Sequence, residues 1–243
     1  MSGNHTGLCF SNLRRALRTS AGVAAGVVGA VVYSDWLFVE PTIGRELSPV
    51  RSYVSELGAL SMPHHAVVNV LDVLCGACVF LFAVRLSRAL PRAGRARLGA
   101  IGLGVFGLTT ALNGLWPMTC APSRDQGCSA GGLALHAARQ DQAATALSVV
   151  ANLAVLASMF WLATALATTP DWQRVARAGR LLLFATVPLT LAVGLLGVLE
   201  GSVGLLQRLL VVLQSAWIVV LALITRVHTA ADRDAADSAV RPR

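Results

Sequence analysis

Long runs of apolar residues, separated by short polar segments, dominate this chain. Each run is about twenty residues long, which is enough for one helix to cross about 30 Å of hydrocarbon. The six runs are Ala21–Val39, Ala66–Val84, Leu98–Trp116, Ala143–Leu166, Leu181–Leu199 and Leu205–Thr225. The pattern predicts an all-α fold, a polytopic membrane helix bundle with about six transmembrane helices.

The composition supports the same class of protein. Of the 243 residues, 55% are hydrophobic and 13% are charged, whereas a soluble domain carries about 25% charged residues. The net charge of +8 is spread over short clusters between the apolar runs, which is typical of topology signals. We therefore expect membrane lipids, and no nucleic acid, around this chain.

The distribution of arginine predicts the orientation. Fifteen of the twenty arginines lie in the amino-terminal segment, in the turns after the second and fourth runs, and in the tail. Because cytoplasmic loops carry the excess of positive charge, both termini are expected in the cytoplasm and the protein in the inner membrane. The expected organisation is a cytoplasmic segment (1–20), a six-helix membrane domain (21–225) and a disordered cytoplasmic tail (226–243).

The longest polar interruption runs from Trp116 to Asp141 and is expected on the outer side. It contains Cys120 and Cys128, and an oxidising compartment permits a disulfide between them. The sequence leaves both the bonded and the free form open.

Asp72 is the clearest charged residue inside a predicted span. An ionisable group at membrane depth is costly and marks a function by default, and Asn69 lies one turn earlier on the same helix face. One interpretation pairs Asp72 structurally with Arg139, Asn113 or Asn152. The other makes Asp72 a group that donates or accepts a proton.

Four further carboxyl groups lie towards the outer side: Asp35, Glu56, Asp125 and Glu200. Each has an ordinary interpretation as a solvated residue, and Glu56 also as part of a helix start. The alternative is that these four and Asp72 surround one outward-facing pocket, a convergence that the sequence leaves open.

No motif points to a cofactor. The chain has no Walker loop, dinucleotide fingerprint, nucleophile elbow or aspartate-rich diphosphate motif. His64, His65 and His136 lack metal-ligand spacing within a helix, so we expect no metal. His136 is a candidate hydrogen-bond partner of Asp125 or Glu56.

Several aromatic residues gather towards the outer side. An interfacial belt accounts for them; alternatively, some line a pocket and stabilise positive charge on a substrate through their ring faces. The candidate substrate-binding residues are the aromatic Trp36, Phe38, Tyr53 and Trp116, together with the polar residues Asn69 and Asn113 of the second and third spans.

A set of short motifs resembles a known family. The motifs are Ser55-Glu56-Leu57-Gly58, Pro63 and Asn69 before the second span, Trp116-Pro117, Asp125, and His136 before the fourth span. Together they resemble bacterial six-helix membrane proteins of the domain-of-unknown-function 998 type, over about residues 20 to 225. The resemblance implies six helices with the polar motif residues at the outer face, and it implies no activity.

The chain also resembles, more weakly, the small integral-membrane terpene cyclases of meroterpenoid and prenylated-indole pathways. Those enzymes lack a diphosphate motif and use buried carboxylic acids, which the resemblance associates with Glu56 and Asp72. They often have seven spans, whereas this chain has six, and their acids do not align residue by residue.

The leading functional hypothesis is a metal-independent membrane enzyme that cyclises an apolar isoprenoid or lipid by acid–base chemistry. Glu56 or Asp72 is the expected acid, because an apolar site keeps a carboxyl group protonated. Asp35, Asp125 or Glu200 is the expected base, and His136 an orienting partner. The alternative is a non-catalytic lipid-binding, transport or complex-subunit protein, and the oligomeric state stays open.

Overall fold

The computed structural model describes residues 21–43, 46–90, 94–128, 138–199 and 202–240. Throughout this part of the chain the regular secondary structure is helical. Residues 21–33 are helical and are followed, after a turn, by α2 (Trp36–Ile43). The remaining elements are η1 (Val54–Gly58), α3 (His65–Ala89), α4 (Gly94–Leu115), α5 (Arg139–Ala165), η2 (Pro170–Trp172), α6 (Gln173–Val198) and α7 (Gly204–Val240).

Six of these helical segments are long and apolar enough to cross a membrane, which confirms the predicted all-α membrane bundle. The spans are Ala21–Thr42, His65–Arg88, Gly94–Leu115, Arg139–Ala165, Gln173–Val198 and Gly204–Thr225. The first span contains a break at Ser34 and Asp35. The backbone N–H groups of these two residues donate to the carbonyl oxygens three residues earlier, whereas a regular α-helix uses the carbonyl four residues earlier.

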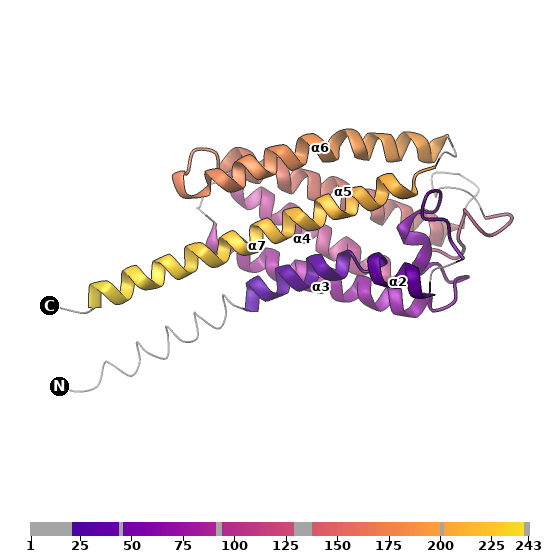
Figure 1. Cartoon of the computed structure of the whole chain (residues 1–243), viewed down its shortest axis with the longest axis horizontal. Helices are drawn as coiled ribbons and strands as arrows, with labels where there is room; N and C mark the ends of the chain where they lie inside the picture. The colour runs from indigo at the N-terminus through magenta and orange to yellow at the C-terminus, as the bar shows by residue number, and fades with distance from the viewer. Residues whose placement is uncertain (1–20, 44–45, 91–93, 129–137, 200–201, 241–243) are drawn as a thin grey trace, which may run out of the picture.

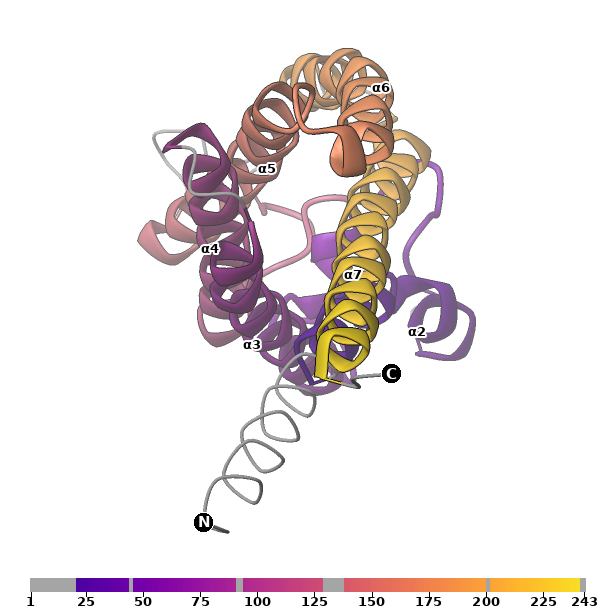
Figure 2. The same ribbon diagram turned by 90° about the vertical axis from the view of Figure 1, so that its left-hand side faces the viewer.

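The long helices run side by side along the molecule (Figure 1). Viewed down their axes, helices that follow one another in the chain are also neighbours in space, so that α3, α4, α5, α6 and α7 form a ring (Figure 2). The first helix lies between α3 and α7 and completes this ring: Gly26 packs against both Phe82 and Ala222.

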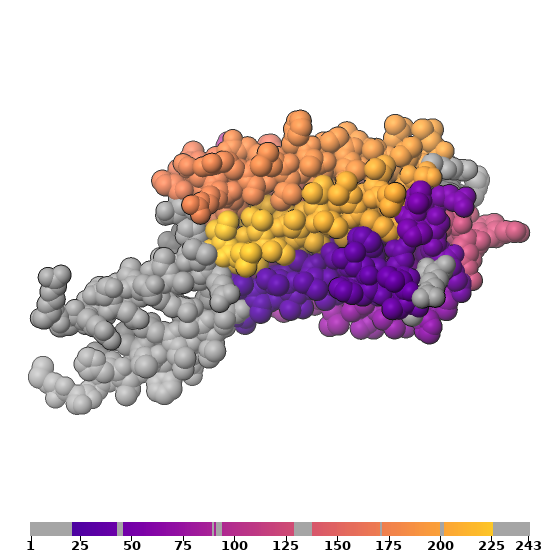
Figure 3. Space-filling model, viewed as in Figure 1, coloured from indigo at the N-terminus to yellow at the C-terminus, as the bar shows by residue number. Residues whose placement is uncertain are grey.

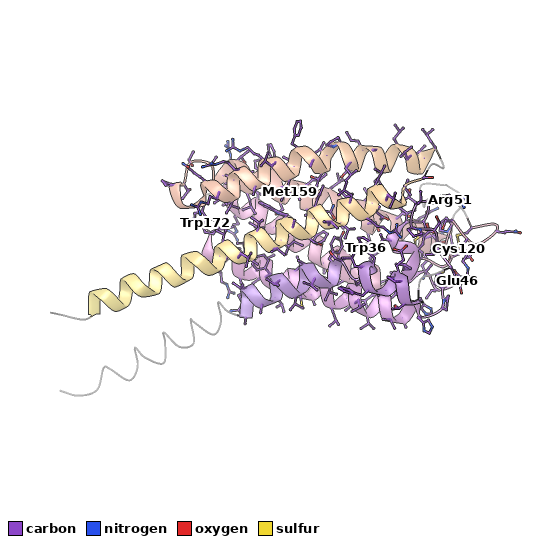
Figure 4. The ribbon with its side chains drawn as sticks, viewed as in Figure 1. Trp36, Glu46, Arg51, Cys120, Met159 and Trp172 are labelled. Atoms are coloured by element: carbon purple, nitrogen blue, oxygen red, sulfur yellow. A yellow bond between two sulfur atoms is a disulfide. The ribbon has the colours of Figure 1, made fainter. Side chains whose placement is uncertain are left out.

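Two clusters of buried residues form the core. The larger one lies along the bundle and includes Phe82, Phe106, Met159 and Trp217. The smaller one lies at one end and consists of Val39, Leu47, Leu57, Ala59, Met62, Val68 and Ala121. We call residues 46–64 and 116–128, which cover this end, the cap. Glu46, Arg51 and Cys120 mark the cap in Figure 4, and Trp172 marks the opposite end.

Glycine allows α3 and α4 to pack against each other at backbone distance. A Cβ atom added to Gly107 would lie 2.6 Å from the backbone nitrogen of Phe80 and 2.8 Å from the carbonyl oxygen of Gly76. Small residues are the usual means of bringing membrane helices this close. The α3–α4 pair is therefore a rigid unit, and it carries Asp72 on one helix and Asn113 on the other.

The last helix is longer than the sequence predicted. It continues past Thr225 to Val240, whereas we expected a disordered tail from residue 226. Residues 229–239 include five alanines, and alanine has the highest intrinsic helix propensity of all residues. The low hydropathy of this segment indicated that it leaves the membrane, but carried no information against a helix.

We expect Gly107→Ala to destabilise the protein, because its methyl group would collide with the α3 backbone. Overpacking of this kind costs about 1–3 kcal/mol. Gly104→Ala, one turn earlier on α4, is the matched control, since its Cβ would meet nothing closer than 3.7 Å. Thermal unfolding in detergent should show a lower midpoint for Gly107→Ala alone. Equal midpoints for the two variants would contradict the close packing.

Candidate functional site

A cavity of about 440 Å³ lies inside the bundle next to the cap. Its lining comes from η1, from the cap residues 117–122 and from all five helices of the ring. The lining residues from α3 and α4 are polar, namely Asn69, Asp72 and Asn113, and α5 adds Thr145, Ser148 and Asn152 beside the apolar Val149. By contrast, α6 contributes only Val193, Val198 and two glycines, and the cap adds Pro117, Met118 and Pro122 beside Tyr53 and Ser55. The side formed by α3, α4 and α5 is therefore the polar side, and the cavity suits an apolar molecule that carries one polar group.

Asp72 lies on the polar side of this cavity. The close approach of α4 fixes its position, because a Cβ atom on Gly114 would lie 2.9 Å from the Cβ atom of Asp72. Within the described part of the chain, no hydrogen bond or ion pair reaches its carboxyl group. Asn113 and Asn152, two of the partners that the sequence suggested, instead bond to other residues. Asp72 therefore presents an unengaged carboxyl group to the cavity.

A chain of hydrogen bonds holds the amide groups on the same side. The Tyr33 hydroxyl donates to Gln214 Oε1 at 2.9 Å, and Gln214 Nε2 donates to Asn152 Oδ1 at 2.8 Å. Asn152 Nδ2 then donates to the carbonyl oxygen of Ser148, whose hydroxyl accepts from Asn113 Nδ2 at 3.2 Å. This chain of hydrogen bonds runs from the first helix through α7 and α5 to α4, and it fixes the orientation of the side-chain amides on the polar side of the cavity.

Two buried acceptor oxygens near this network have no partner among the described residues: Asn113 Oδ1 and Asp35 Oδ2. Asn113 lines the cavity, and a buried unpaired acceptor of this kind costs about 1–3 kcal/mol. Asp35 lies at the break in the first span, near enough to Asp72 to interact with it electrostatically, but it does not line the cavity.

Glu56 has a structural place in the cap. It is 1% exposed. One carboxylate oxygen accepts the Tyr53 N–H at 2.8 Å, and the other accepts the N–H and the hydroxyl of Ser123 at 2.9 and 2.6 Å. These bonds tie the two halves of the cap together. Glu56 is absent from the cavity lining, so the structure does not bring it to Asp72 as the hypothesis of a shared pocket required.

Asp125 also belongs to the cap, and not to the cavity. Its carboxylate accepts the Ser61 hydroxyl at 2.5 Å and the Ala121 N–H at 2.8 Å. These hydrogen bonds, the Ser61 bond first, hold the pKa of Asp125 below its ordinary value. The neighbouring Cys120 and Cys128 are joined by a disulfide, which is the bonded form of the pair that the sequence left open.

The aromatic candidates divide into one cavity residue and three others. Tyr53 lines the cavity, and burial, with the Glu56 carboxylate adding to it, raises the pKa of its hydroxyl. Trp36 instead faces Arg208, whose guanidinium carbon lies 5.6 Å from the ring centroid. Phe38 and Trp116 are 67% and 58% exposed on the outside of the bundle, as expected of an interfacial belt.

Four residues of the predicted site therefore lie together in the lining of the cavity: Asp72, Asn69, Asn113 and Tyr53. Glu200 and His136, two further predicted residues, lie outside the part of the chain that the structure describes.

The sequence profile of the family described as "Protein of unknown function (DUF998)" matches residues 19–224. The chain belongs to this family. No curated protein and no solved structure shows a significant match to it. Because the DUF998 description assigns no activity, the chemistry of this family member has to be argued from the site itself.

One buried ion pair escaped the sequence analysis. Arg208 of α7, 4% exposed, donates from Nε and Nη2 to the two oxygens of Glu40 at 2.9 and 2.8 Å. Its remaining nitrogen, Nη1, donates to the carbonyl oxygens of Pro49 and Ser52. Arg208 lies near the start of the sixth predicted run, and no local pattern predicts the pair because Glu40 lies 168 residues away in the chain.

Ser148 on α5 and Gln207 and Gln214 on α7 were not predicted near the site, and Asn152 was predicted only as a structural partner of Asp72. Ser148 and Asn152 lie one turn apart on α5, and Gln207 and Gln214 lie two turns apart on α7. Polar residues that recur on one face of an apolar helix point into the bundle. The spacings of four residues on α5 and seven on α7 therefore indicate, from the sequence alone, that these side chains face the interior of the bundle.

We expect Glu40→Gln to destabilise the protein strongly, because it leaves the charge of Arg208 buried without a counter-ion. Breaking such a pair costs about 3–5 kcal/mol. The control is Glu46→Gln, which removes a partly exposed ion pair with Arg124 and should cost less than about 1 kcal/mol. Chemical denaturation of the two variants measures the difference; similar losses would refute a special role for Arg208.

The lowered pKa of Asp125 predicts a pH-dependent contribution to stability. The ionised carboxylate stabilises the cap above the pKa of the unfolded chain, about 3.9, and this stabilisation disappears as pH falls through the folded-state pKa. The midpoint difference between the wild type and Asp125→Asn should be present at neutral pH and vanish in acid. Thermal unfolding across this range tests it, and a difference independent of pH would show that the carboxylate charge is not involved.

Proposed function

We propose that this protein is an integral-membrane enzyme that binds an apolar isoprenoid- or lipid-type molecule in the cavity and transforms it by acid–base chemistry. The most concrete form is the proton-initiated cyclisation of a prenylated substrate, with Asp72 as the acid. The observation that carries this proposal is the Asp72 carboxyl group, which faces a ligand-sized cavity with no hydrogen bond or ion pair from any described residue.

The proposed reaction is balanced without a cofactor. Asp72 transfers a proton to an alkene carbon or an epoxide oxygen, and a carbocation forms. The π electrons of the next double bond attack this centre and close a ring. The final cation then loses a proton from a neighbouring carbon to the Asp72 carboxylate, which regenerates the acid. The product is an isomer of the substrate, so one carboxyl group suffices as acid and base.

The rest of the cavity fits these demands. Its volume of about 440 Å³ falls in the range of small-molecule sites, about 300–1,000 Å³. Asn69 and Asn113 flank Asp72 and are placed to orient a polar group of the substrate. Tyr53 is the aromatic residue of the cavity lining, and an aromatic ring stabilises positive charge through its face. The cap covers one end of the cavity, which favours a carbocation because water would quench it.

A second candidate function is non-catalytic binding of a membrane amphiphile, as in a lipid-binding or transport module. One observation favours it: Asp72 alone among the described acidic residues lines the cavity. Asp35, Glu56 and Asp125, which the sequence offered as acid or base, lie elsewhere. The two functions differ in whether the bound molecule leaves the cavity changed.

We expect Asp72→Asn to lower cyclisation of a farnesylated or geranylgeranylated aromatic compound by at least about 100-fold, as for loss of a general acid. Substrate and product have equal mass, so chromatographic retention before mass spectrometry measures turnover. Asp125→Asn is the control, since it makes the same carboxyl-to-amide change at a cap residue that does not line the cavity. If Asp72→Asn keeps wild-type turnover, Asp72 is not the acid. If the wild type binds these compounds without converting them, the binding function replaces the enzyme.

A further inference from the structure

The half of α6 nearest the cap is the least buried wall of the cavity. The buried residues of α6 are Val175, Ala176, Gly179 and Thr186, so none lies in residues 187–198. Pro188 lies at the start of this stretch. In the space-filling view α6 lies along one edge of the molecule, with α7 between it and the first helix (Figure 3).

This half of α6 nevertheless contributes four residues to the cavity lining: Val193, Gly194, Gly197 and Val198. Leu191, Leu195 and Val198, which follow one another along one face of this helix, are 68%, 61% and 69% exposed. This half of α6 therefore borders both the cavity and the outside of the bundle, and two of its four lining positions, Gly194 and Gly197, carry no side chain.

The two glycines have different surroundings. A Cβ atom on Gly197 would collide with the Tyr53 hydroxyl, so packing accounts for glycine there. A Cβ atom on Gly194 would meet nothing within 4 Å. Glycine in a helix interior lowers stability relative to alanine, and in membrane helices its usual benefit is close helix packing. Neither packing nor an unusual backbone angle accounts for Gly194.

We propose that Gly194 is a specificity-determining position that sets how bulky a ligand the cavity admits. This inference rests on the proposed function, in which the cavity holds an isoprenoid-type molecule. The missing side chain leaves room at the α6 wall for the apolar part of that molecule, while Asp72 and Asn113 on the facing wall hold its polar end. A larger residue at 194 occupies this room and shortens the ligand that fits.

A labelling experiment tests the free space without any ligand. Ser148→Cys places a thiol on the polar wall of the cavity, and a benzyl methanethiosulfonate reagent reports whether the cavity admits a bulky group. Adding Gly194→Leu should abolish labelling at 148. Adding Gly94→Leu should not, because a Cβ at Gly94 also meets nothing within 4 Å but lies outside the cavity lining. Equal labelling in both double variants would overturn the proposal.

A graded series then tests specificity. Geranyl-, farnesyl- and geranylgeranyl-substituted hydroquinones are the probes, and ligand-induced thermal stabilisation is the readout. Gly194→Ala and Gly194→Leu should move the preference stepwise to shorter chains, and Gly194→Ala should raise the melting temperature of the ligand-free protein. An equal loss for all three probes, or an unchanged preference, would refute the size role. If the wild type binds none of them, the isoprenoid function fails, while the labelling result still decides the role of Gly194.

Discussion

Arg208 brings a full positive charge into the interior of the bundle, and the cap is built around the groups that neutralise it. Glu40 supplies the counter-charge, the carbonyl oxygens of Pro49 and Ser52 accept the remaining hydrogen bonds, and Trp36 covers the guanidinium with its ring. An uncompensated buried charge costs several kcal/mol. The helix break in the first span, the cap and the start of α7 are therefore held in one arrangement.

The cavity depends on that arrangement, because the cap closes one end of it. The carboxylates around it are distinguished by their partners. Glu40 is paired with the Arg208 guanidinium, and Glu56 and Asp125 each accept hydrogen bonds from two residues, so all three carboxylates hold the structure in place. Asp72 has no such partners among the described residues and faces open space. This contrast, more than the number of acids at one end of the bundle, identifies the residue that is available for chemistry.

How far the sequence predicts this structure depends on the range of the interaction. The six spans follow from local hydropathy, and Asp72 is conspicuous because a charge in an apolar run has few ordinary explanations. The role of Glu56 was not predictable, because its partner Ser123 lies 67 residues away. The pairing of Arg208 with Glu40 spans an even longer separation. Interactions that form only when the helices assemble into the ring leave no local pattern in the sequence.

Photo-crosslinking of the membrane-embedded protein with a farnesyl hydroquinone bearing a diazirine shows whether the cavity beside Asp72 holds an isoprenoid-type molecule. If it does, we expect adducts on cavity residues such as Asp72, Ser148 and Val193, and the loss of these adducts when unlabelled farnesyl hydroquinone competes. Adducts confined to lipid-facing residues such as Phe184 and Leu191, without competition, would contradict it.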